Sequence, residues 1–161
     1  MPLPTTITEL LECLHSARAE WDKAIEKLDD RQLIQPNVCG HWSVKDIIAH
    51  VAWYDNQMVD VISSHSMAGA SEWWLLSTDE RNEKIYREIK GKSLNDVRHQ
   101  AKTVFETMMK CIHEMKDEEL TDPSRFDGMP LDWLPIDIIA QNTWQHTQAH
   151  LPGILRFFQI K

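Results

Sequence analysis

Residues 43–63, SVKDIIAHVAWYDNQMVDVIS, carry the clearest fold signal in this chain. Their apolar side chains recur at steps of three and four residues, which is the period of one helical face. That stripe consists of Val44, Ile47, Ile48, Val51, Met58, Val59 and Ile62. Ser43 precedes Asp46 by three residues, the spacing of a helix N-cap. The pattern predicts an amphipathic helix whose inward face also carries His50 and Tyr54.

The same period recurs in three other long segments of the 161-residue chain. These segments cover about 6–30, 93–116 and 135–157, and a shorter helix is predicted at about 78–90. Strand-like alternation and internal repeats are absent from the sequence. Pro152 lies inside the last segment, where we expect it to remove a backbone hydrogen bond and bend the helix.

Four long amphipathic segments predict an all-α four-helix bundle, with residues 1–161 forming a single domain. The connection after the second long helix is itself long and contains the short helix. A crossover of this kind allows the second and third long helices to run parallel.

The charge of the chain narrows the classes of partner. Lys and Arg number 17 against 25 Asp and Glu, a net charge of −8 without a basic cluster. This balance argues against binding to nucleic acid or to an anionic membrane surface. The first residues lack the pattern of a signal peptide, and the three cysteines lack CxxC spacing. We therefore expect a cytoplasmic protein with free thiols.

Residues 142–150, NTWQHTQAH, contain the strongest chemical signal. His146 and His150 are four residues apart and so share one helical face, about one turn from each other. His50 supplies a third imidazole from the inward face of another helix. Three neutral imidazoles suit a transition metal and leave coordination positions open. The alternative is that these histidines lie at the edge of the core, bonded to carbonyls or carboxylates.

Other polar and aromatic residues are candidates for the same site. Tyr54 can donate a proton or simply pack in the core, and Asn142 can orient a ligand or make an interhelical hydrogen bond. Trp73 and Trp74 can roof a cavity, cover the end of the bundle or lie in a dimer interface. Three further residues can line a pocket or have purely structural roles: Trp53, Asn82 and Glu83.

Three stretches resemble the DinB-like (DinB/YfiT) superfamily of four-helix bundles. The first is GHWSVKDIIAH at 40–50, the second NEKIY at 82–86 followed by KSLNDV at 92–97, and the third is 142–150. The second and third stretches are most similar to the ClbS/DfsB branch. The motifs occur in order, so the resemblance covers almost the whole chain.

This resemblance implies an up-down-down-up bundle with a metal site on His50, His146 and His150. The expected ion is divalent, zinc or nickel first, with iron or manganese as further options. Many members are dimers, and related bundles are transferases that use low-molecular-weight thiols. The ClbS branch is associated with hydrolysis of a cyclopropane in a genotoxin, without a clear need for metal.

Three functional hypotheses follow. The first is a metal-dependent hydrolase or thiol transferase acting on an electrophilic or toxic small molecule, with Tyr54 and Asn142 as catalytic candidates. The second is a metal-free ClbS-like hydrolase or ligand-binding protein. The third is a non-enzymatic dimeric binding module. In each case a homodimer is expected.

Overall fold

The computed structural model describes residues 2–160, and within that range the regular secondary structure is entirely helical. The α-helices are α1 (Ile7–Ile25), α2 (Asp30–Ile34), α3 (Val44–Ser64), α4 (Thr78–Ile89), α5 (Leu94–Glu114), α6 (Pro135–Asn142) and α7 (Trp144–Phe157). Short 3-10 helices occupy the long connections: η1 (Met67–Gly69), η2 (Glu72–Leu75), η3 (Asp117–Leu120) and η4 (Pro123–Arg125). The predicted all-α class is confirmed. None of the described helices is long and apolar enough to cross a bilayer.

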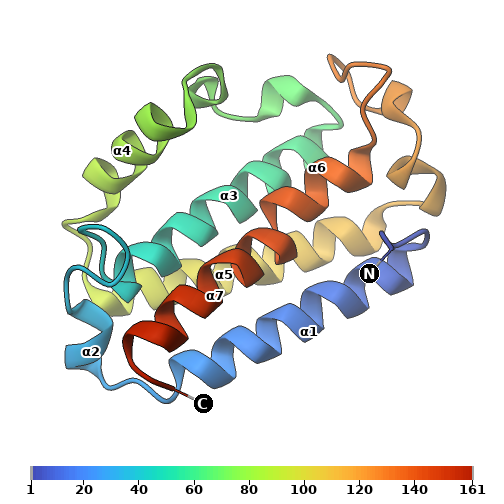
Figure 1. Cartoon of the computed structure of the whole chain (residues 1–161). Helices are drawn as coiled ribbons and strands as arrows, with labels where there is room; N and C mark the ends of the chain where they lie inside the picture. Colours follow the sequence, from blue (N-terminus) through green and yellow to red (C-terminus); the bar gives the residue numbers. More distant parts are fainter. Residues whose placement is uncertain (1, 161) are drawn as a thin grey trace.

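The long helices form an up-down-down-up bundle (Figure 1). Helix α3 packs along α5, and these two helices run in the same direction. Helix α1 packs along α7, and both run in the opposite direction to α3 and α5. The crossover between α3 and α5 contains α4, which lies against α3 on the outside of the bundle.

Reciprocal capping fixes where α3 begins. The Ser43 hydroxyl accepts a hydrogen bond from the Asp46 backbone N–H at 3.2 Å, and the Asp46 carboxylate accepts one from the Ser43 N–H at 2.9 Å. Both residues are buried, so this capping box is protected from water. The start of α3 in turn sets the register that places His50 and Tyr54 on the inner side of the helix.

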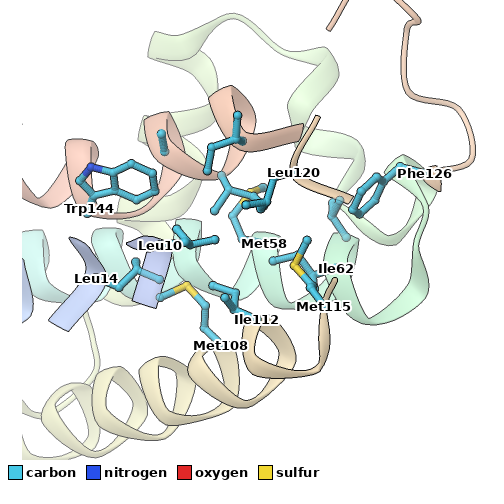
Figure 2. Packing of buried hydrophobic residues seen from close by; sticks show 14 of the residues in the cluster. Leu10, Leu14, Met58, Ile62, Met108, Ile112, Met115, Leu120, Phe126 and Trp144 are labelled. Atoms are coloured by element: carbon cyan, nitrogen blue, oxygen red, sulfur yellow. The ribbon is translucent and has the colours of Figure 1, made fainter. Parts of the chain in front are cut away.

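Two apolar clusters fill the bundle. Figure 2 shows one of them, in which Leu10 of α1, Met58 of α3 and Ile112 of α5 meet with at most 1% of their surface exposed. Trp144, the first residue of α7, closes this cluster. Ile154 of the same helix is buried in the other cluster, so the two clusters together fix the rotation of α7 and the direction in which its histidines point.

The first helix is shorter than predicted. We expected it to continue to about residues 29–30, but it ends at Ile25 and a separate helix α2 follows. Asp29 caps α2 through a reciprocal capping box with Gln32. The acidic pair at Asp29 and Asp30 is thus a helix start, because aspartate stabilises the first turn better than the last.

The prediction of one continuous C-terminal helix was also wrong. The chain is interrupted at Thr143, whose φ of −122° and ψ of −102° separate α6 from α7. The Thr143 hydroxyl donates a hydrogen bond to the Ile139 carbonyl at 2.7 Å, an alternative to the regular backbone ladder. Pro152 lies inside α7, which continues to Phe157. The interruption therefore precedes the HxxxH pair.

Candidate metal centre

Three histidines meet where α3 faces α7. The Nε2 atoms of His50 and His146 are 3.1 Å apart, and those of His146 and His150 are 3.0 Å apart. One ligand atom from each of the three lies within 4.8 Å of the other two. His50 is 3% exposed, and the other two are partly buried. The structure thus brings together the trio predicted from the sequence.

Hydrogen bonding between the imidazoles accounts poorly for this arrangement. A neutral imidazole nitrogen either carries one hydrogen or offers one lone pair in the ring plane. The Nε2 of His146 has two imidazole neighbours at hydrogen-bond distance, and a single atom of this kind satisfies only one of them well. A cation that accepts lone pairs from all three nitrogens resolves the conflict.

The electrostatics favour the neutral form that binds metals. Burial lowers the pKa of His50 to about 2, with the imidazoles of His146 and His150 and the charge of Arg81 adding to the effect. The pKa of His146 is lowered to about 3, mainly by burial and to a smaller extent by the neighbouring imidazole of His150. Burial also lowers the pKa of His150. Unprotonated nitrogens are therefore available as ligands at neutral pH.

The spacing suits a first-row divalent ion. Nitrogens bound at about 2.1 Å to one ion lie roughly 3.0–3.4 Å apart at octahedral to tetrahedral angles. Two of the three nitrogen pairs are at 3.0 and 3.1 Å. Within residues 2–160 this is the one group of three or more His, Cys, Asp and Glu side chains with such geometry. Three protein ligands leave positions open for a substrate or water.

Packing orients the imidazole rings. The Nδ1 atoms of His50 and His146 are buried, and neither has a hydrogen-bond partner among the described residues. The ring centroids of Trp42 and His50 are 4.9 Å apart, and those of Tyr54 and His146 are 4.5 Å apart. Aromatic contacts thus fix the orientation of the imidazole rings, a role that hydrogen bonds to Nδ1 have in many metal sites.

Tyr54 connects the histidines to the crossover helix. Its hydroxyl accepts a hydrogen bond from Arg81 Nε at 3.0 Å and donates one to Asn82 Oδ1 at 3.2 Å. Its ring also lies 4.9 Å from that of His50. Two residues of α4 therefore hold the hydroxyl of a tyrosine whose ring contacts two of the three histidines.

An aromatic wall, formed by Tyr54, Trp73 and Trp74, lies along one side of the histidine site. Trp74 of η2 packs edge-on against Tyr54 at 5.5 Å, and Trp73 stacks on Trp53 at 5.9 Å. Of the three roles considered for Trp73 and Trp74, these contacts fit a cover over the side of the histidine site. Glu83, in contrast, forms an exposed ion pair with Arg87 at 2.8 Å, typical of a solvated helix face.

Asn142 lies in a different position from the one that its spacing suggested. Its amide donates a hydrogen bond to the Ile138 carbonyl at 2.8 Å, at the end of α6. Within residues 2–160 it makes no hydrogen bond to the three histidines. The break at Thr143 separates Asn142 from the face of α7 that carries His146. A catalytic role for Asn142 stays a prediction, as does that of Tyr54.

Neither Trp42, whose ring contacts that of His50, nor Arg81 was among the site residues predicted from the sequence. Arg81 reaches the site through Tyr54. It is 9% exposed and lies on the buried face of α4 with Ile85 and Ile89. The signal was present in the sequence, since an arginine precedes these two isoleucines at steps of four residues. A cation on an apolar stripe indicates a buried charge with a specific role.

Comparison with known proteins identifies the family. A model of the DinB superfamily matches residues 13–152, so this chain belongs to the DinB superfamily. A crystal structure of an uncharacterised protein from Escherichia coli UTI89 has a similar fold, with a TM-score of 0.72 at 16% sequence identity. The similarity covers 98% of this chain and 95% of that one. Among curated proteins, none matches the sequence significantly.

Proposed function

We propose that this protein is a divalent-metal-dependent enzyme that acts on an electrophilic small molecule, either as a hydrolase or as a thiol transferase. The observation that carries the proposal is the convergence of three neutral imidazole nitrogens from α3 and α7. A structural metal site usually has four protein ligands, whereas three protein ligands leave a coordination position open for water or a substrate.

His50, His146 and His150 would hold the ion, with zinc and nickel as the best candidates for an all-imidazole donor set. When bound, such an ion acts as a Lewis acid that polarises a substrate and makes water or a thiol more acidic. The aromatic wall of Tyr54, Trp73 and Trp74 excludes water from one side of the site. The Tyr54 hydroxyl, held by Arg81 and Asn82, would donate a hydrogen bond or proton to a substrate once its single hydrogen turns away from Asn82 Oδ1.

Turnover of a panel of electrophiles tests the proposal, measured with and without a low-molecular-weight thiol. The panel contains activated esters, epoxides and haloalkyl compounds. We expect activity that a chelator abolishes, that zinc or nickel restores, and that His146→Ala removes. His99→Ala is the matched control, because His99 is an exposed histidine on α5. A thiol requirement indicates a transferase, and its absence a hydrolase.

The second candidate is a metal-free protein of the ClbS type that binds or hydrolyses a hydrophobic electrophile. The aromatic wall favours it, because rings from α3 and η2 form an apolar surface beside polar groups of α4. This version predicts ligand-dependent tryptophan fluorescence and activity that a chelator leaves unchanged. Loss of activity in EDTA argues against it.

We also propose that the protein is a homodimer. Large apolar side chains are exposed in two connections, with Leu75 at 90%, Leu131 at 79% and Trp133 at 43% exposure. Exposed apolar groups of this size are typical of contact surfaces. Light scattering after size exclusion measures the mass directly. A non-enzymatic dimeric module predicts that alanine at all three site histidines changes neither the melting temperature nor the mass.

A further inference from the structure

The crossover helix α4 brings a buried cation to the histidine site. Arg81 is 9% exposed, and its Nε donates a hydrogen bond to the Tyr54 hydroxyl at 3.0 Å. Its guanidinium carbon lies 4.5 Å from the centroid of the Trp74 ring. Tyr54 in turn contacts the rings of His50 and His146. One side chain thus separates Arg81 from the imidazoles.

This buried cation has no acidic partner in the part of the chain that the structure describes. Its terminal Nη1 and Nη2 atoms make no hydrogen bond or ion pair there. The neighbouring acids of α4 are engaged elsewhere, Glu80 with Ser77 and Glu83 with Arg87. Contact with aromatic faces offsets only part of the cost of burying a charge. A buried guanidinium normally has a carboxylate or phosphate partner.

Two other N–H donors near Arg81, on Asn82 and Trp74, also have no acceptor among the described residues. The Asn82 Oδ1 accepts from Tyr54, which leaves the Nδ2 hydrogens of Asn82 without a described partner. The Nε1 of Trp74 is buried, and it too has no acceptor within residues 2–160. The terminal nitrogens of Arg81, the Asn82 amide and the Trp74 indole thus offer N–H groups and a positive charge with no described acceptor.

We propose that Arg81 binds a carboxylate group of the substrate, with the Asn82 amide as a second donor, beside the metal position. The planar guanidinium fork matches a carboxylate, and a single arginine suits a monoanion better than a dianionic phosphate. A divalent ion on three neutral histidines adds further positive charge, which an anionic substrate balances. This inference rests on the proposed function, for which it names a substrate class.

Calorimetric titration with three probes tests the proposal: benzoate, the neutral isostere benzamide, and phenyl phosphate. The zinc-loaded and metal-free proteins are both titrated, and zinc affinity is measured separately. We expect benzoate to bind at least about tenfold more tightly than benzamide. Arg81→Gln should weaken benzoate binding about ten- to hundredfold and leave benzamide unchanged. Arg87→Gln, on the exposed side of the same helix, should change neither.

The outcomes separate this inference from the proposed function. Failure to bind zinc contradicts the metal-dependent function, while benzoate selectivity in the metal-free protein still supports the role of Arg81. Zinc binding with equal benzoate affinity in wild type and Arg81→Gln overturns the inference. Tighter binding of phenyl phosphate than benzoate overturns the carboxylate assignment. If Arg81→Gln does not fold, Arg81→Lys serves, and its loss of the planar fork should still weaken benzoate binding.

Discussion

Metal affinity should depend only weakly on pH between 7.5 and 5.0, because the site histidines resist protonation. Protons compete with a metal for each imidazole by a factor of 1 + 10^(pKa − pH). Three histidines with the ordinary pKa of 6.5 would together lose about 35,000-fold in affinity at pH 5.0. With the pKa lowered to about 2 in His50 and about 3 in His146, these two contribute almost nothing.

Burial also lowers the pKa of His150, so the loss at pH 5.0 is smaller than the factor of about 33 that one histidine with the ordinary pKa would give. Competition of the protein with a chelator of known pH dependence measures the zinc affinity at each pH. Circular dichroism at the same pH values confirms that the protein is folded. A loss greater than about a thousandfold in the folded protein refutes the reasoning, because it requires at least two imidazoles that protonate normally.

Three further substitutions test the packing of the bundle and of the residues beside the site. Burial raises the pKa of Asp55 to about 7, and Arg18 offsets this only in part, so folding favours the protonated acid. Between pH 4 and 8 the unfolding free energy of the wild type should therefore fall by up to about 4 kcal/mol relative to that of Asp55→Asn. Urea denaturation measures both, and the same pH dependence of unfolding free energy in the two proteins would contradict this. Leu10→Ala, at a side chain with 0% exposure, should cost about 2–5 kcal/mol in the same assay, and a cost below about 1 kcal/mol would show that the core relaxes around the cavity. Tyr54→Phe removes the acceptor for Arg81 Nε and should lower stability by about 1–3 kcal/mol; an unchanged melting temperature would show that water replaces the hydroxyl.

Much of the fold was predictable because its signals are local. The period of α3 and the Ser43 cap both lie in the single stretch 43–64, and so the helix and its inward face could be predicted directly. The division of the last helix was harder to predict. A threonine hydroxyl that bonds a carbonyl one turn earlier has no distinctive sequence pattern. Pro152 was expected to bend the last helix, and it lies inside α7, while the interruption occurs at Thr143.

The site, too, has features that local sequence predicts and features that depend on tertiary packing. His146 and His150 share a face through helical geometry alone, and the inward position of His50 came from its helix. The stripe of Arg81, Ile85 and Ile89 could have indicated a buried cation, but its contact with Tyr54 depends on how the crossover helix packs over α3, which the sequence of α4 does not contain. Asn142 shows the converse, since regular spacing suggested a place on the histidine face and the Thr143 break interrupts that register.

The most direct test of the central claim is the metal content of the native protein. Native mass spectrometry and elemental analysis should be applied to protein purified without a histidine tag, after incubation with zinc or nickel. We predict one divalent ion per chain in wild type, unchanged in His99→Ala and absent in His146→Ala. Wild-type protein that retains no ion, or His146→Ala protein that retains it fully, would contradict a metal site on His50, His146 and His150.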